Sequence, residues 1–246
     1  MLGKPKVKYI QNVGQKKFRE QEGLFIAEGP RLVEELIASP GTVITGIFAV
    51  PEWAEEHKDQ CGSIPVTIID QKELEKISQL RTPNQVLALV RQFAFGQPMP
   101  AAGRISLVLD TIRDPGNFGT ILRIADWFGI HQVLASPDCA DMYNPKVVQA
   151  TMGSIARVKV FYLDIEDWLA GQENTRVYAA VLGGNDISTM KKIKEGIIII
   201  GNEAKGISDA LLKHPHEKIT IRRIGQAESL NAAVATGIIL SHLTPG

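Results

Sequence analysis

The chain of 246 residues lacks several features that mark particular classes of protein. Its only cysteines, Cys61 and Cys139, form neither a disulfide nor a metal pattern, so we expect a reducing, cytoplasmic setting. Aliphatic runs such as Ile197–Ile200 are far too short to span a bilayer. Met1–Ile10 is basic but no apolar stretch follows it, which predicts that there is no signal peptide.

Several motifs of common enzymes are also missing. The sequence contains no G-x-x-x-x-G-K-[ST] phosphate loop, no G-x-G-x-x-G dinucleotide fingerprint and no G-x-S-x-G nucleophile elbow. His214 and His216 stand in a proline-containing loop without a third ligand nearby, so we expect no metal. The absence of these motifs therefore argues against an ordinary ATPase, a dinucleotide-dependent enzyme or a serine hydrolase.

What is present is an ordinary globular composition with an uneven charge. Hydrophobic residues make up 44% and charged residues 22%, which excludes a disordered, collagen-like or coiled-coil chain. The net charge is zero, yet residues 1–19 carry six basic side chains and no acid. This +6 segment is either an arm that binds phosphates or a solvated, partly frayed terminus, and charge alone favours the second interpretation.

The segment Gly96–Gly103, with two prolines and two glycines, is the best linker in the chain. We therefore expect one domain at 1–96, a linker at 97–104 and a second domain at 105–246. Apolar runs predict strands and helical spacing predicts helices in the first part, which makes it a small α/β domain. The expected strands are 24–27, 43–50, 66–69 and 86–90, and the expected helices are 31–38, 51–59 and 71–80.

The second part alternates more strongly between strands and helices. Its strands are continuous hydrophobic runs, which indicates burial on both faces and hence a largely parallel sheet. Ligands bind beyond the carboxyl ends of such strands. We therefore expect the binding site in the loops after Leu109, Leu182, Ile200 and Ile221. The expected strands are 105–109, 132–135, 158–161, 177–182, 197–200 and 219–221, and the expected helices are 120–128, 145–152, 165–170, 209–213 and 231–243.

Three of these loops concentrate polar residues and glycines. In the first, Pro115 and Gly116 force a turn, and Asn117 can cap the helix that carries Arg123. The bland alternative is that Asn117 is only a cap and Arg123 only pairs with Asp126 on the surface. The second loop is Gly201–Ser208, with Glu203, and its bland alternative is a strand-to-helix turn with a solvated acid. The third loop is Glu228–Asn231, with Ser229, and its bland alternative is a helix cap.

In this order and spacing the three loops resemble the three motifs of the SpoU (TrmH-like) RNA 2′-O-ribose methyltransferases, in the SPOUT superfamily. The first motif corresponds to Asp114–Arg123, the second to Ile200–Ser208 and the third to Glu228–Asn231 with the helix after it. Tyr143–Ser154 matches another run of the family, and Phe25–Arg31 is similar to its appended substrate-binding domain. This sequence departs from the family pattern at Phe118, Ala204, Arg222-Arg223 and Ala232-Ala233.

The resemblance implies a fold and a cofactor. It implies an α/β catalytic domain whose parallel sheet carries a deep trefoil knot, preceded by a small α/β domain like certain ribosomal proteins. It implies a homodimer that packs through the first-motif helix and the last helix. It also implies S-adenosylmethionine as methyl donor, with S-adenosylhomocysteine as product and no metal. The residues that would hold the cofactor are Leu182, Ile200, Gly201, Ile221 and Leu230.

The resemblance further implies methyl transfer to a ribose 2′-hydroxyl of RNA, with ribosomal RNA preferred over transfer RNA. Arg123 corresponds to the family's catalytic arginine, and the other implied catalytic residues are Asn117, Glu203, Ser229 and Asn231. Lys16, Lys17, Arg19 and Arg31 are the side chains we expect to contact RNA. Two alternatives stay open, a non-catalytic RNA-binding paralogue in ribosome assembly and a small-molecule enzyme on an ordinary doubly wound sheet.

Overall fold

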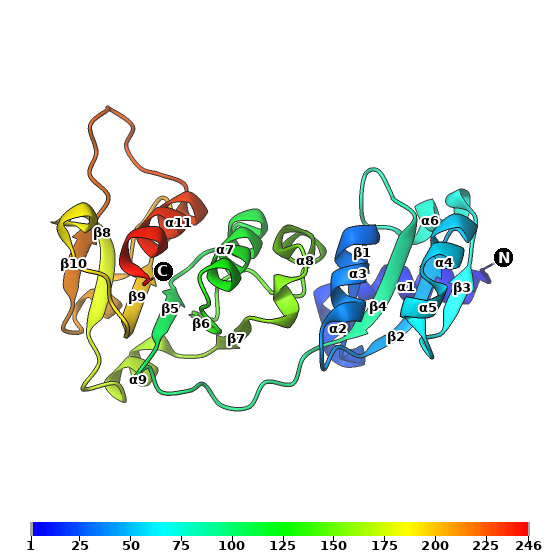
Figure 1. The fold of residues 1–246 in the computed structure, drawn as a ribbon, viewed down its shortest axis with the longest axis horizontal. Helices are drawn as coiled ribbons and strands as arrows, with labels where there is room; N and C mark the ends of the chain where they lie inside the picture. Colours follow the sequence, from blue (N-terminus) through cyan, green and yellow to red (C-terminus); the bar gives the residue numbers. More distant parts are fainter. Residues whose placement is uncertain (1, 246) are drawn as a thin grey trace. The chain divides into compact units, whose positions relative to one another are not determined.

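The computed structural model describes residues 2–245, which form two compact units (Figure 1). The first unit contains the chain up to Ala94 together with Asp141–Ala156, and the second contains Phe95–Ala140 and the chain from Arg157 onward. Met1 and Gly246, the outer ends of the two predicted domains, lie outside the described residues. Among residues 2–245, no helix is both long and apolar enough to cross a membrane.

The first unit is built on a mixed four-stranded sheet in the order β1-β4-β2-β3. Strand β4 is antiparallel to both of its neighbours, whereas β2 and β3 are parallel. The predicted small α/β domain is confirmed. Its strands are β1 (Leu24–Glu28), β2 (Ile44–Ala49), β3 (Val66–Ile68) and β4 (Val86–Arg91), and its helices are α1 (Lys4–Val13), α2 (Lys16–Glu22), α3 (Pro30–Ala38), α4 (Pro51–Glu56), α5 (Lys58–Cys61), α6 (Gln71–Ile77) and α8 (Pro145–Thr151).

The basic amino-terminal segment is not a frayed arm but the two helices α1 and α2. Ile10 and Val13 of α1 are fully buried, so this helix contributes to the core of the unit. Arg19 of α2 is only 2% exposed, and its guanidinium donates to the Gly14 carbonyl oxygen and pairs with Asp141 at 2.6 Å. The structure thus corrects the expectation for Arg19, because a buried and paired guanidinium is not presented to RNA phosphates.

The segment Asp141–Ala156 belongs with the first unit, although a boundary at residue 96 assigns it to the second. The Tyr143 ring stacks on Phe25 of β1 at 5.1 Å, and its hydroxyl oxygen accepts a hydrogen bond from the Phe93 backbone N–H at 2.8 Å. Burial raises the pKa of Tyr143, which therefore stays protonated. These contacts connect residues far apart in sequence, which a linear reading of composition does not reveal.

The predicted linker is fixed to the second unit. The Met99 backbone exchanges two hydrogen bonds with the side-chain amide of Gln132, at 3.0 and 2.9 Å. The Ala101 backbone N–H donates to Gln172, and the Ala101 side chain is fully buried. A proline- and glycine-rich composition therefore marks an irregular segment here, but the amide side chains satisfy its backbone and hold it in place.

The second unit has a six-stranded sheet in the order β10-β8-β9-β5-β6-β7, and all of its neighbours are parallel. The predicted parallel sheet is confirmed. Its strands are β5 (Ile105–Leu109), β6 (Gln132–Ala135), β7 (Lys159–Tyr162), β8 (Val177–Asp186), β9 (Gly196–Ile200) and β10 (Glu217–Thr220). Its α-helices are α7 (Pro115–Trp127), α9 (Ile165–Ala170), α10 (Asp209–Leu212) and α11 (Ala232–Leu243).

Helices pack on both faces of this sheet. Val108, Ile197 and Ile199 form one buried cluster with Leu169 of α9 and Leu211 of α10. Because side chains alternate along a strand, the intervening strand residues face the opposite side. Helices α7 and α11 pack against each other (Figure 1). A sheet covered in this way explains why its strands read as continuous hydrophobic runs.

The helix α7 begins five residues earlier than the predicted start at Thr120. The Asp114 carboxylate, not Asn117, caps it, since Asp114 accepts a hydrogen bond from the Asn117 backbone N–H at 2.7 Å. Pro115 then occupies the first helical position, where its missing N–H costs nothing. The predicted cap was wrong, and the Asn117 side chain is left available for another partner.

Candidate active site

Three polar side chains of the second unit meet in one hydrogen-bonded chain; they come from the start of α7, the loop after β9 and the N-cap of α11. Asn117 donates through Nδ2 to Oε1 of Glu203. Asn231 donates through its own Nδ2 to Oδ1 of Asn117 at 2.7 Å. The structure therefore brings together three of the five side chains that the resemblance implied as catalytic.

Strand order accounts for this meeting. Asn117 follows β5 and Glu203 follows β9, and these strands are parallel neighbours, so their carboxyl ends lie at the same edge of the sheet. Asn231 is the N-cap of α11, with Oδ1 accepting from the backbone N–H groups of Ala233 and Val234. Capping uses the oxygen of this amide and leaves its nitrogen to donate to Asn117.

The other two implied catalytic residues are exposed and lie outside this chain of hydrogen bonds. Arg123 stands on α7, about 9 Å further along the helix axis than Asn117. Within residues 2–245 the Arg123 guanidinium makes no hydrogen bond or ion pair, and Asp126 pairs with Arg157 instead. The surface pair between Arg123 and Asp126 is therefore not formed. Ser229 lies in the exposed connection 221–231 between β10 and α11 (Figure 1).

The loop that carries Glu203 folds back tightly on itself. Asn202 and Gly206 form an antiparallel bridge, with backbone hydrogen bonds of 3.0 and 2.8 Å. A Cβ added at Gly201 would meet the backbone of Gly206 and Ile207, with the Gly206 carbonyl oxygen at 2.5 Å. Glycine is thus required at 201 by the loop's own backbone, a reason separate from the cofactor contact that the resemblance implied.

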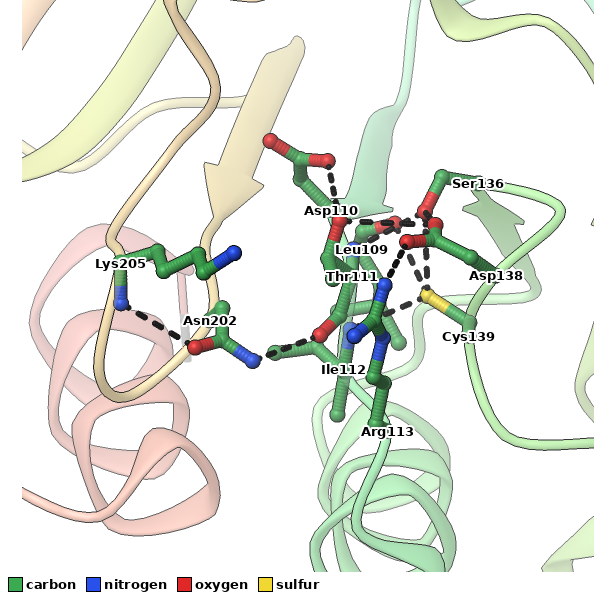
Figure 2. A network of polar contacts seen from close by, with 10 residues as sticks. All are labelled: Leu109, Asp110, Thr111, Ile112, Arg113, Ser136, Asp138, Cys139, Asn202 and Lys205. Atoms are coloured by element: carbon green, nitrogen blue, oxygen red, sulfur yellow. Dashed lines mark hydrogen bonds and ion pairs between the residues drawn. The ribbon is translucent and has the colours of Figure 1, made fainter.

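A buried polar network at the end of β5 was not singled out from the sequence. Asp110 is only 5% exposed and accepts hydrogen bonds from the Ser208 backbone N–H at 2.7 Å and from the Thr111 hydroxyl at 3.1 Å. Figure 2 shows this network, in which Ser136 and Asp138 surround Thr111. A hydrogen bond from the Ser136 hydroxyl lowers the pKa of Asp138, so this carboxylate stays ionised. The signal in the sequence was a polar residue placed directly after a buried strand.

Cys139 lies in the same network, and its thiol is buried and hydrogen-bonded within the fold. Its thiol accepts from the Ile112 backbone N–H at 3.2 Å and donates to the Leu109 carbonyl oxygen at 3.3 Å. Burial raises the pKa of this thiol, which keeps it protonated at neutral pH. Among the described residues 2–245, no group of three or more His, Cys, Asp or Glu side chains could hold a metal ion.

Two of the five residues implied for cofactor binding, Leu182 and Ile221, line one pocket of about 380 Å³ in the second unit. Gly183 and Thr220 lie beside them, and Asp186 adds a carboxylate. A backbone hydrogen bond from Ser188 lowers the pKa of Asp186, which is therefore ionised. Of the other implied residues, Ile200 is buried, Gly201 follows it and Leu230 is 45% exposed.

The volume and lining of this pocket suit a small molecule that carries polar or charged groups. Its volume is within the usual range for small-molecule sites, its walls include apolar side chains, and a carboxylate is placed to accept from hydroxyl or ammonium groups. Arg222 and Arg223 at its edge, two of the departures from the family pattern, add cations that suit a carboxylate or a phosphate.

The predicted RNA-contacting side chains divide into two groups. Lys16, Lys17 and Arg31 are exposed in the first unit, whereas Arg19 is buried. Lys16 pairs with Glu20 at 3.8 Å, but both side chains are more than 60% exposed, so this pair constrains Lys16 little.

Comparison with known proteins identifies the class. Residues 104–241 match the model of the SpoU rRNA Methylase family, and residues 4–88 match that of the MRM3-like substrate binding domain. The first match covers more than half of the chain. The protein therefore belongs to the SpoU rRNA methylase family, and the resemblance drawn from the motifs is confirmed.

Individual relatives match along nearly the whole chain. The chain is 30% identical over 241 residues to the 23S rRNA (guanosine(2553)-2'-O)-methyltransferase RlmP of Bacillus subtilis, covering 97% of this chain and 95% of that protein. An AdoMet-bound rRNA methyltransferase from Sinorhizobium meliloti has a TM-score of 0.85 and 30% identity, over 98% of this chain and 95% of the other. A protein from Porphyromonas gingivalis described as an RNA methyltransferase of the TrmH family has a TM-score of 0.85 and 32% identity, over 99% and 98%.

Proposed function

We propose that this chain transfers the methyl group of S-adenosylmethionine to a ribose 2′-hydroxyl of ribosomal RNA. The observation that carries this conclusion is the joining of Asn117, Glu203 and Asn231, from the three motif loops of a SpoU family member, at one edge of a parallel sheet. The relative from Bacillus subtilis is named for the same reaction on 23S rRNA. The S. meliloti relative binds AdoMet.

The chemistry asks this chain mainly to position and activate the hydroxyl. When bound, S-adenosylmethionine supplies a methyl group that its sulfonium makes strongly electrophilic. The ribose 2′-oxygen bonds to the methyl carbon while the carbon–sulfur bond breaks and its electron pair moves to sulfur; the hydroxyl proton leaves to a phosphate or water. Alignment of the three atoms is worth several kcal/mol of barrier.

In this proposal each implied catalytic residue has a role. Arg123 keeps its charge, because a guanidinium is not deprotonated in proteins, and it stabilises the negative charge that develops on the 2′-oxygen. Asn117 and Glu203 orient the ribose and, in the complex with substrate, Arg123; in the structure their hydrogen bond joins them to each other and not to Arg123. Ser229 and Asn231 complete the site near the methyl group. Leu182, Ile200, Gly201, Ile221 and Leu230 hold the cofactor.

We assign RNA binding to residues 1–96 and methyl transfer to residues 105–246, joined by residues 97–104. The match of residues 4–88 to a substrate-binding domain supports this division. The exposed cations Lys16, Lys17 and Arg31 contact RNA phosphates. We place the reaction in the cytoplasm, which agrees with the two free cysteines, both buried.

Replacing Lys16, Lys17 and Arg31 together by alanine is expected to weaken RNA binding by about tenfold at low salt and to reduce the salt slope by about two units, the value for three phosphate contacts on single-stranded RNA. Titration of labelled ribosomal RNA by fluorescence anisotropy at several salt concentrations measures both quantities. The matched control is a triple alanine variant of Lys58, Lys72 and Lys76, which are also exposed in the same unit. Equal losses in the two triple variants would mean that binding follows net charge alone.

The finer architecture is also part of the proposal. We propose that the carboxy-terminal part of the second unit is knotted and that the protein is a homodimer packed through α7 and α11. Family membership supports both statements. The dimer has further support in two exposed apolar side chains on these helices, Trp127 at 83% and Val234 at 50% exposure.

Trp127→Asp is expected to convert the dimer into a monomer, because it places a charge in an apolar interface. Sedimentation equilibrium measures the mass directly. Ile224→Asp makes the same kind of change at a residue that is 92% exposed on the 221–231 connection, and it should leave the mass unchanged. A wild-type chain that sediments as a monomer would refute the dimer.

The proposed reaction is tested by incubating purified protein with methyl-labelled S-adenosylmethionine and total RNA that lacks its own modification. Label in the 2′-O-methyl nucleotide of one ribosomal RNA position is the expected result. Cofactor at a hundred times its Kd should also stabilise the fold by about 2.7 kcal/mol. Binding of both cofactor and RNA without any label would instead support the non-catalytic paralogue. A protein that does not bind the cofactor would contradict the proposed methyl transfer.

A further inference from the structure

The side chain of Asn202 bridges the first and second motif loops. Its Nδ2 donates to the Thr111 carbonyl oxygen at 2.9 Å, across 91 residues of sequence. Its Oδ1 accepts from the backbone N–H groups of Ala204 and Lys205 at 2.9 and 3.1 Å. Figure 2 shows this amide between the turn of its own loop and the backbone after β5. The Asn202 side chain thus stabilises the turn that carries Glu203 and bonds this turn to the loop before Asn117.

A second connection lies behind the first. The buried carboxylate of Asp110, directly after β5, accepts from the Ser208 backbone N–H at the other end of the Glu203 loop. The Glu203 loop is therefore held at both ends to residues 110–111, just before the first motif, by Asn202 at its start and by Ser208 at its end. Between these two points Glu203 has little freedom to move away from Asn117.

The backbone of Thr111 is strained, so this connection between the loops costs conformational energy. Its φ of 59° lies in the left-handed region, where a β-branched residue is strained. Hydrogen bonds from its backbone N–H to Ser136 and from its hydroxyl to Asp110 maintain this conformation. It directs the Thr111 carbonyl oxygen to the amide of Asn202. Strain that surrounding contacts maintain in this way is typical of sites where geometry matters for function.

We propose that Asn202, supported by Asp110, is a positioning residue that holds the Glu203 carboxylate against Asn117 for methyl transfer. The proposal rests on the proposed function. Asparagine meets both demands, because it offers an acceptor to the turn and a donor to Thr111. Aspartate keeps the acceptor, but it would set a second lone-pair-bearing oxygen against the Thr111 carbonyl. The change Asn202→Asp therefore removes the bridge between the loops and retains the local turn.

Asn202→Asp is expected to lower kcat about 100-fold, the loss typical of a reacting group displaced by about 1 Å. KM for RNA and the Kd for S-adenosylmethionine should stay within about threefold of wild type, since neither ligand contacts this amide in the proposal. Asn174→Asp is the matched control, because Asn174 is exposed in the connection that enters β8 from the opposite end of the sheet. If Asn202→Asp does not fold, Asn202→Ser takes its place, since its hydroxyl can accept from the turn but is too short to reach Thr111.

A double-mutant cycle with Asn117→Ala separates positioning from a general loss of structure. If Asn202 acts by holding Glu203 on Asn117, its substitution should cost less than about threefold in a chain that already lacks the Asn117 amide. The same 100-fold loss in both backgrounds, or an unchanged kcat in the single variant, would overturn the proposal.

Amide hydrogen exchange of the peptide 201–208 provides a readout that does not depend on catalysis. Exchange should be faster in Asn202→Asp than in wild type and unchanged in Asn174→Asp. If the wild-type protein does not methylate RNA, the proposed function fails by itself. The exchange comparison then decides the positioning role alone, because unchanged exchange would show that Asn202 does not hold the loop.

Discussion

Arg123→Ala is expected to lower the rate of methyl transfer about 1,000-fold, the upper end of the loss seen when one stabilising donor is removed from a developing oxyanion. Arg123 is exposed on α7 and has no polar partner among residues 2–245, so its removal breaks no internal contact. Stability and cofactor affinity should therefore remain at wild-type values. Single-turnover methylation at saturating RNA and calorimetric titration of S-adenosylmethionine measure the two quantities separately.

Two further variants sharpen this prediction. Arg123→Lys keeps the charge but loses the planar fork, so an intermediate rate is expected. Arg176→Ala removes another exposed arginine from the same unit, just before β8, and should leave the rate unchanged. Near-normal methylation by Arg123→Ala would end the assignment of Arg123 as the charge that stabilises the 2′-oxygen.

Gly201→Ala is expected to lower the methylation rate by at least about 100-fold and to destabilise the fold by about 1–3 kcal/mol. The added methyl group would overlap the Gly206–Ile207 backbone, so the bridge between Asn202 and Gly206 must open. Glu203 lies inside that bridged turn and moves with it. Thermal unfolding and the methylation rate at saturating RNA measure the two effects.

Gly96→Ala is the control for this substitution. A Cβ at Gly96 meets no heavy atom within 4 Å, and its φ does not lie in the left-handed region. Stability and rate should therefore stay close to wild type. A Gly201→Ala protein with normal stability would mean that the loop relaxes without cost, and the requirement for glycine at 201 would then come from the cofactor alone.

Much of the fold could be predicted because each element leaves a local pattern. The strands β5 and β6 have the predicted bounds, since a polar residue follows each apolar run, Asp110 after β5 and Ser136 after β6. The helix α9 also has the predicted bounds, with Asp164 as its N-cap. The start of α7 was misplaced because Asp114 and Asn117 are both good caps, and the sequence does not say which side chain the backbone N–H groups will use.

The candidate site was only partly predictable, for a related reason. Asn117, Glu203 and Asn231 stand in recognisable motifs, so their residue types and spacing pointed to the site before any geometry was known. Asp110 and Asn202 stand in the same loops, but the motifs do not predict them as site residues. The role proposed for them rests on hydrogen bonds across about 90 residues or more, which no local pattern encodes.

By itself the sequence determined the α/β class, the parallel sheet, the loops that carry the site and the family, because these follow from periodicity and short motifs. Only the tertiary structure decided which of several polar side chains serve the site and which serve the fold. Arg19 was one of six cations in the same basic segment, and its burial against Asp141 removes it from the RNA-facing set. The sequence predicts Asn117 as a helix cap. In the structure the neighbouring carboxyl ends of β5 and β9 bring its side chain to Glu203 instead. The physical reason is the same in both cases: a polar side chain acts through the partner it meets, and that partner is chosen by packing between distant segments.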